Sequence, residues 1–163
     1  MQTWGRHLAV ATLAVGFSLW AQGNPASGQA ADLRIGTWEL NVAKSKFSPG
    51  PPPKSLTLKF EAAGKGIKVT TNGMNAEGQS THAEYTANYD GKDYPITGSP
   101  VADTISLKRI DARTVRRTDK KSGKVVQTLT SKVSSDAKLL TVTVKGTDPT
   151  GKPVSNVLVW EKQ

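Results

Sequence analysis

The chain has 163 residues and no cysteine, and its 22 Lys and Arg residues outnumber its 13 Asp and Glu residues, giving a formal net charge of +9. This length suits one domain with a single hydrophobic core. The missing cysteines exclude a disulfide scaffold, cysteine-ligated zinc, iron–sulfur clusters, thiol catalysis and lipoprotein anchoring. Only two histidines, His7 and His82, are present, which excludes a site built from several imidazoles.

Residues 1–30 have the composition of a secretory signal peptide. Arg6 and His7 form a short basic start, residues 8–20 form an apolar run, and the residues that follow are mostly small. Signal peptides have a basic region, an apolar region and a cleavage site in this order. The apolar run is also shorter than the ~20 residues that a membrane-spanning helix needs. We therefore predict a signal peptide rather than an uncleaved anchor, followed by one domain over residues 31–163.

The preferred cleavage point follows Ala30, where Gly28, Gln29 and Ala30 supply a small-x-small ending, and residues 21–23 offer a second such ending. Export predicts a periplasmic or extracellular protein, and the absence of cysteine predicts that it is not a lipoprotein. An exported domain could form disulfides, but this chain has no cysteine. Its stability must therefore come from burial of the hydrophobic core.

The remainder of the chain alternates apolar and polar residues with the period of a β-strand. Leu56, Leu58 and Phe60 share one face of an extended segment, and residues 140–145 are the plainest case. Threonine and valine are abundant, and Gly-, Asp- or Ser-rich turns separate the runs. The pattern predicts an all-β fold, a single antiparallel up-and-down β-barrel of about 8–10 strands. Ten strands fit, over residues 34–41, 54–62, 66–73, 79–89, 92–97, 103–110, 113–119, 124–133, 138–146 and 153–162.

One long irregular connection, over residues 42–53, contains Pro49 and the run Pro51 to Pro53. Proline cannot donate a ladder hydrogen bond and favours an extended chain. The connection is interpreted either as a spacer across one end of the barrel or as a docking segment for a partner. It leaves no segment for lid helices.

The first and last predicted strands carry short motifs. Gly36 and Trp38 form a Gly-x-Trp on the first strand, and the last ends in Trp160, Glu161 and Lys162. These motifs, with the strand spacing between them, resemble the calycins, which include lipocalins and fatty-acid-binding proteins. The chain also resembles small exported bacterial lipocalin-like proteins. The resemblance implies a ligand-binding barrel in which Trp38 plugs the closed end, with Lys162 in the place of the basic residue that caps it in lipocalins.

Fatty-acid-binding proteins hold the ligand carboxylate with an Arg-x-Tyr on the closing strand. The matching positions here are Leu158 and Trp160, and the strand over residues 124–133 contains no arginine. The resemblance therefore does not extend to that way of holding a carboxylate.

A basic cluster occupies one predicted hairpin. Alternation places Arg116 and Arg117 on opposite faces of their strand, so one of the two must point toward the barrel interior or its mouth. A buried arginine is a candidate to hold a ligand carboxylate or phosphate, and the alternative is that it pairs internally or reaches solvent. The cluster comprises Arg109, Arg113, Arg116, Arg117, Lys120, Lys121 and Lys124, with Asp111 and Asp119 as its only acids.

The predicted ligand-binding residues are Arg116, Arg117, Tyr85, Tyr89, Phe60 and Leu158. Tyr85, Tyr89 and Tyr94 are expected to offer hydroxyl groups near the mouth. The inward positions expected to line the barrel are Leu56, Leu58, Phe60, Val69, Tyr85, Leu107, Val142 and Leu158.

Catalytic and metal-binding motifs are weak. His82 and Glu84 share one face of a predicted strand, but no serine elbow or further ligand cluster accompanies them. The aspartates lie at turns without the spacing of a calcium loop, and no phosphate-binding or dinucleotide motif is present. We expect no enzyme activity, no cofactor and no metal. Aromatic residues make up only 6% and do not interleave with the basic cluster, which argues against nucleic-acid binding.

Two functions from different classes remain. The first is a non-enzymatic exported binding module, expected to be a monomer, that holds a small hydrophobic or amphipathic ligand in its barrel. The second is a structural or surface-interaction domain whose barrel is filled by its own side chains and which acts through its basic hairpin on an anionic lipid or envelope surface.

Overall fold

The computed structural model describes residues 32–163, which form ten β-strands. The predicted signal peptide lies outside the described residues. The strands are β1 (Gly36–Leu40), β2 (Ser55–Ala63), β3 (Gly66–Met74), β4 (Ser80–Ala87), β5 (Tyr94–Thr97), β6 (Thr104–Arg109), β7 (Thr114–Lys121), β8 (Lys124–Val133), β9 (Leu139–Thr147) and β10 (Pro153–Lys162).

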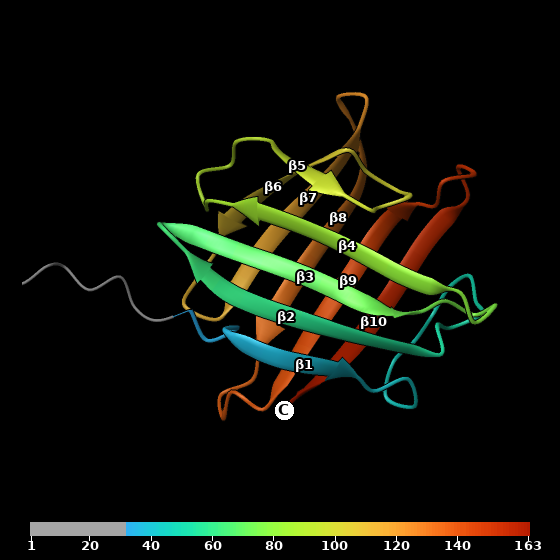
Figure 1. Cartoon of the computed structure of the whole chain (residues 1–163), viewed down its shortest axis with the longest axis horizontal. Helices are drawn as coiled ribbons and strands as arrows, with labels where there is room; N and C mark the ends of the chain where they lie inside the picture. The colour runs from blue at the N-terminus through green and yellow to red at the C-terminus, as the bar shows by residue number, and fades with distance from the viewer. Residues whose placement is uncertain (1–31) are drawn as a thin grey trace, which may run out of the picture.

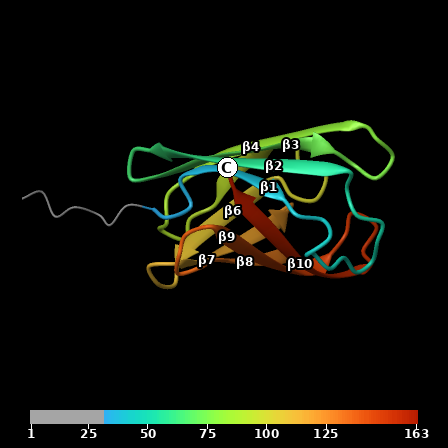
Figure 2. The ribbon, with the colours of Figure 1, turned by 90° about the horizontal axis from the view of Figure 1, so that it is seen from below.

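Each strand pairs antiparallel with the next one in the chain, and β10 pairs with β1 to close the barrel. The closing ladder has three residue pairs, one of which joins Trp38 to Lys162. Strands β2, β3 and β4 cross in front of β7 to β10 (Figure 1), and the barrel is flattened into two facing layers (Figure 2). The prediction of an all-β antiparallel up-and-down barrel is confirmed, and residues 32–163 contain no lid helices.

The predicted strand ends agree with the observed ends to within two residues. The alternating pattern decides which side chains enter the core: on β9, Leu140, Val142 and Val144 are buried and the residues between them are not. Strand β7 departs from simple pairing at a bulge between Asp119 and Lys120, where the register with β8 shifts. Beyond the bulge, Lys120 pairs with Val125 and Lys121 with Lys124, so the strand continues to Lys121, two residues past its predicted end.

The proline-containing connection between β1 and β2 lies along β10. Lys46 and Val157 exchange two backbone hydrogen bonds, and Ser155 N donates to Ser48 O. These contacts cover the part of β10 that the short β1 leaves unpaired, which protects an otherwise exposed strand edge. The connection is thus packed on the barrel wall rather than crossing its end. None of the described residues belongs to a helix that could span a membrane.

Candidate ligand-binding cavity

The barrel interior contains a cavity of about 210 Å³, called here the main cavity. Its walls come from the inward faces of β2, β3, β4 and β6 to β10, together with Arg34 just before β1. Most of the lining is apolar, as is usual for small-molecule sites. The lining residues are Arg34, Leu56, Leu58, Phe60, Val69, Thr71, Tyr85, Leu107, Val115, Arg117, Leu129, Ser131, Val142, Leu158 and Trp160.

All eight positions expected to line the barrel border the main cavity. Among the predicted ligand-binding residues, Phe60, Tyr85, Leu158 and Arg117 are in this lining. Arg116 is exposed on the outer face of β7, so Arg117 is the arginine that points inward.

Tyr89 is not part of the main cavity lining, and its hydroxyl is engaged elsewhere. It donates a short hydrogen bond to Asp32 and accepts one from Arg34 at 2.5 Å. The guanidinium of Arg109 stacks on the Tyr89 ring, 4.4 Å from its centroid, and also contacts the Asp32 carboxylate at 3.3 Å. Tyr89 therefore helps to hold the Asp32–Arg34 pair rather than a ligand.

Arg34 is a charged lining residue that the strand pattern did not predict. The other lining residues outside the predicted set are Thr71, Val115, Leu129, Ser131 and Trp160. Its side chain is 4% exposed and binds Asp32 through two hydrogen bonds, Nε to Oδ1 at 3.1 Å and Nη2 to Oδ2 at 2.8 Å. Burial acts to raise the pKa of the Asp32 carboxyl, but the hydrogen bonds and charge of Arg34 outweigh it, and the pKa lies well below its usual range. The pair is therefore ionised and compensates its own charge.

Arg117 is the second arginine in the lining, and Asp119 neutralises it. Arg117 Nε and Nη2 donate to the two oxygens of Asp119 at 2.5 and 2.7 Å, and Asp119 is 2% exposed. The guanidinium also lies over the Tyr85 ring, 4.9 Å from its centroid. Burial acts to lower the pKa of Arg117, but Tyr85 and Asp119 raise it above its usual value. Both lining arginines thus already have a carboxylate partner.

Gly36, Trp38 and Lys162 form a contact cluster where β1 begins. Trp38 is fully buried, and its Nε1 donates to Arg34 O at 2.7 Å. Lys162 Nζ lies 5.2 Å from the centroid of the Trp38 ring. A Cβ at Gly36 would meet Lys162 Cε at 3.1 Å, in a backbone conformation with φ of +125° that favours glycine. The three motif residues therefore support one another.

The other two motif residues have separate roles. Trp160 is 3% exposed and borders the main cavity, and its Nε1 is the one fully buried side-chain nitrogen or oxygen in residues 32–163 without a hydrogen-bond partner. Glu161 faces outward and accepts hydrogen bonds from Asn41 at 3.0 Å and Lys44 at 2.8 Å. These contacts attach the chain after β1 to β10.

His82 and Glu84 lie on the outer face of β4 and bind different partners. His82 Nδ1 is 2.7 Å from Asn72 Oδ1, and Glu84 forms an ion pair with Lys68 at 3.2 Å. The two side chains therefore do not form a catalytic pair. No group of three or more His, Cys, Asp or Glu residues suited to a metal ion occurs within residues 32–163.

More of the basic side chains on the hairpin form ion pairs with acidic residues than the sequence suggested. Besides Arg117, two of its residues pair with acids from outside the hairpin: Arg109 with Asp32, and Lys120 with Asp93 at 2.8 Å. The exposed members are Arg113, Arg116, Lys121 and Lys124.

No protein-family model and no curated protein matches the chain. Among solved structures, the zebrafish ileal bile acid-binding protein complexed with cholic acid is similar to it, with 12% identity, a TM-score of 0.49 and coverage of 80% of this chain and 99% of that chain. A likeness of this strength says nothing about a ligand, and the closed ten-strand barrel is defined by its own strand pairing.

Proposed function

We propose that this chain is a non-enzymatic exported binding protein that holds one small hydrophobic or amphipathic molecule in its barrel. The observation that carries the proposal is the main cavity of about 210 Å³, lined mainly by apolar side chains from eight strands. A barrel filled by its own side chains would leave no such space. The resemblance to calycins, and the Gly36, Trp38 and Lys162 contacts, support the same proposal.

The volume limits the size of the ligand. An apolar cavity of about 150 Å³ accommodates benzene, or about 25 Å³ for each non-hydrogen atom. By that ratio a cavity of about 210 Å³ takes about eight non-hydrogen atoms. The body of the ligand is therefore a single ring or a short alkyl chain.

The charge of the lining limits the ligand as well. Asp32 neutralises Arg34, and Asp119 neutralises Arg117. A ligand carboxylate in the main cavity would meet no lining arginine without a carboxylate partner, since Arg109, which shares Asp32, lies outside the lining. Burying such a charge is costly. The ligand is therefore uncharged where it contacts these pairs.

Titration with toluene, followed by amide chemical shifts, tests binding in the main cavity. At about −0.7 kcal/mol for each of its seven non-hydrogen atoms, toluene should bind with a Kd of about 0.1–1 mM. Shift changes should centre on Leu58, Val142 and Leu158, which line the cavity. Absence of binding up to the solubility of toluene, for an intact folded protein, would contradict the proposal.

Native mass spectrometry of the protein purified from its own host addresses the natural ligand. A retained small molecule of low mass should accompany the protein, and replacing Val142 by phenylalanine should remove it. The same measurement gives the amino terminus, for which cleavage after Ala30 predicts a chain beginning at Ala31. Retention of residues 1–30 would contradict the proposed export by a cleaved signal peptide.

A second candidate function, docking on an anionic surface, is favoured by the outer face of β6 to β9. Four exposed basic side chains lie there, and Lys108 and Arg116 are directly opposed across the β6–β7 ladder. None of the four forms an ion pair within residues 32–163. They are Lys108, Arg116, Lys132 and Lys145.

Sedimentation with vesicles containing phosphatidylglycerol tests this second candidate. Binding should weaken strongly as salt is added, and the double variant Arg116→Ala/Lys132→Ala should reduce it. The matched control is Lys59→Ala/Lys68→Ala, which removes two lysines that are paired with acids on another part of the wall. Binding that does not respond to salt or to loss of Arg116 and Lys132 would contradict it.

A further inference from the structure

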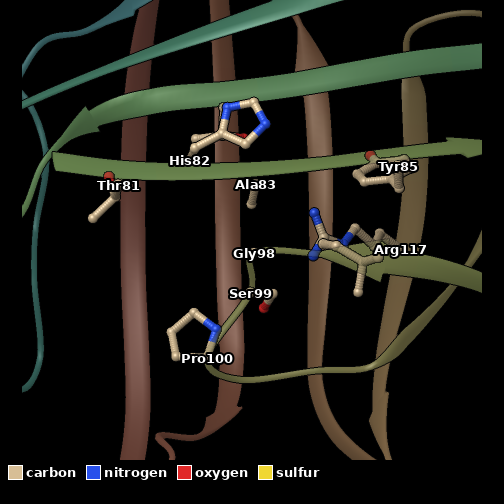
Figure 3. Close-up of a pocket in the computed structure, with 10 residues that line it drawn as sticks. Thr81, His82, Ala83, Tyr85, Gly98, Ser99, Pro100 and Arg117 are labelled. Atoms are coloured by element: carbon tan, nitrogen blue, oxygen red, sulfur yellow. The ribbon is translucent and has the colours of Figure 1, made fainter.

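A second space, called here the side pocket, adjoins the main cavity at the wall between β4 and the segment that follows β5. It has a volume of about 160 Å³. Figure 3 shows the Arg117 side chain projecting into this space, between Tyr85 on β4 and the segment containing Ser99 and Pro100. The lining residues are Thr71, Thr81, His82, Ala83, Tyr85, Ile96, Gly98, Ser99, Pro100 and Arg117.

The side pocket exists because β4 and β5 pair over only two residues, Glu84 with Thr97 and Tyr85 with Ile96. The opposite edge of β4 pairs with β3 over eight residues. Beyond Thr97 the chain turns at Gly98, whose φ is +72° and whose Cβ would lie 2.0 Å from His82 O. Only glycine permits this close approach to β4. The β4–β5 ladder nevertheless ends at Thr97, and residues 98–100 form no further pairs with β4.

Three residues border both the main cavity and the side pocket, and all three carry polar groups: Thr71, Tyr85 and Arg117. Arg117 uses Nε and Nη2 for Asp119 and also interacts with the Tyr85 side chain, so at least one of the two Nη1 hydrogens has no partner in residues 32–163. The Thr71 hydroxyl likewise makes no hydrogen bond there. Neither atom is among the fully buried side-chain atoms without a partner. Both are therefore accessible from the pockets that Thr71 and Arg117 line. Free hydrogen-bonding groups therefore gather where an apolar space meets a more polar one.

We propose that the side pocket binds the uncharged polar end of the ligand, while the main cavity binds its apolar body. This inference rests on the proposed binding function and adds the orientation and chemical class of the ligand. Arg117 Nη1 and the Thr71 hydroxyl donate to an alcohol or carbonyl oxygen at the junction. The ligand class is a small alcohol, ketone or ester with an apolar body of about eight carbons.

A carboxylate is disfavoured at the junction by the buried Asp119. The Arg117–Asp119 pair carries no net charge, so an added carboxylate would leave one negative charge uncompensated. An uncharged oxygen accepts the free Arg117 hydrogen bond without this penalty. Asp119 thus acts as a positioning residue that sets the preference for an uncharged ligand.

Octan-1-ol and octanoate share the same chain length and test this preference by calorimetry at neutral pH. Octan-1-ol should bind the wild-type protein at least about tenfold more tightly than octanoate does. Any apolar cavity would favour octan-1-ol over octanoate to some extent, because a buried carboxylate is costly. The variants therefore test whether Asp119 sets the preference. Asp119→Asn leaves Arg117 uncompensated and should raise octanoate affinity by about tenfold or more, while octan-1-ol affinity changes little.

Thr71→Val conserves shape and tests the junction without disturbing the buried pair. Loss of one hydrogen bond should weaken octan-1-ol by about three- to tenfold and leave toluene binding unchanged. The control is Thr70→Val, the same substitution on the outer face of β3, which should alter neither. Should Asp119→Asn fail to fold, this comparison still decides the matter.

The possible failures are distinct. If neither toluene nor octan-1-ol binds, the proposed binding function fails and the side-pocket inference fails with it. If toluene binds but octan-1-ol affinity ignores Thr71→Val, or folded Asp119→Asn leaves octanoate binding unchanged, the inference about the side pocket is overturned and the binding function stands.

Discussion

Replacing Val142 by phenylalanine asks whether the barrel interior is empty or filled. Val142 is 8% exposed and borders the main cavity. Phenylalanine adds four carbon atoms, and at about 0.8 kcal/mol for each buried carbon the gain is at most about 3 kcal/mol. Filling about 100 Å³ of cavity at about 24 cal/mol per Å³ gives about 2 kcal/mol. After about 1 kcal/mol for lost side-chain freedom, the free energy of unfolding should rise by about 1–2 kcal/mol.

The assay is urea unfolding followed by tryptophan fluorescence, since Trp38 and Trp160 are buried. Val144 supplies the matched control: it is 6% exposed on the same face of β9 but does not border the main cavity. Val144→Phe should overpack the core and destabilise the protein by about 1–3 kcal/mol. If Val142→Phe destabilises the protein as much as Val144→Phe, the interior is filled and the size argument for the ligand fails.

Three further outcomes follow from the buried charges and the β5 turn. Asp32→Asn should lower the free energy of unfolding in urea by about 3 kcal/mol at neutral pH, because Arg34 keeps a buried and uncompensated charge; a change below about 0.5 kcal/mol would contradict the assigned pair. Because the folded pKa of Asp32 lies below its usual value of 3.8, its contribution to stability is present above about pH 4 and is lost as pH falls below it. Acid titration of stability should therefore show a smaller loss in Asp32→Asn than in the wild type, and equal slopes would refute this. Gly98→Ala should destabilise the protein more than Gly91→Ala in thermal unfolding, because both glycines have a positive φ but only Gly98 lies against backbone, 2.0 Å from His82 O.

The strands and most of the lining could be predicted because they depend on local patterns. Period-two alternation sets the inward face of each strand, so Leu56, Leu58 and Phe60 all border the main cavity as expected. The hairpin turns set the order of the strands, and with only short connections that order determines the pairing. Antiparallel neighbours then follow one another around the barrel.

The buried charges could not be placed in the same way. The contacts of Asp32 with Tyr89 and Arg109 join residues far apart in the chain, and the alternation carries no information about them. A local signal did exist for one pair, since Arg117 and Asp119 are opposite charges two residues apart and share a face of β7. That spacing would have assigned Arg117 an internal partner. Asp32 and Arg34 instead meet in a turn before β1, where Ile35 N donates to Asp32 O.

The cavity volume was also beyond sequence patterns, because it is a small difference between the space inside a closed barrel and the volume of the side chains that fill it. The sequence therefore left both a filled and a hollow barrel interior open, and only the three-dimensional structure distinguishes them. Tyr85 and Tyr89 illustrate the limit: both were expected near the mouth, but only Tyr85 borders the main cavity.

A crystal structure of the protein soaked in octan-1-ol tests the central claim most directly. The account predicts one molecule with its chain among Leu58, Val142 and Leu158 and its hydroxyl within hydrogen-bond distance of Arg117 Nη1, at the junction with the side pocket. A main cavity occupied by the protein's own side chains, or an octan-1-ol molecule bound only outside the barrel, would contradict it.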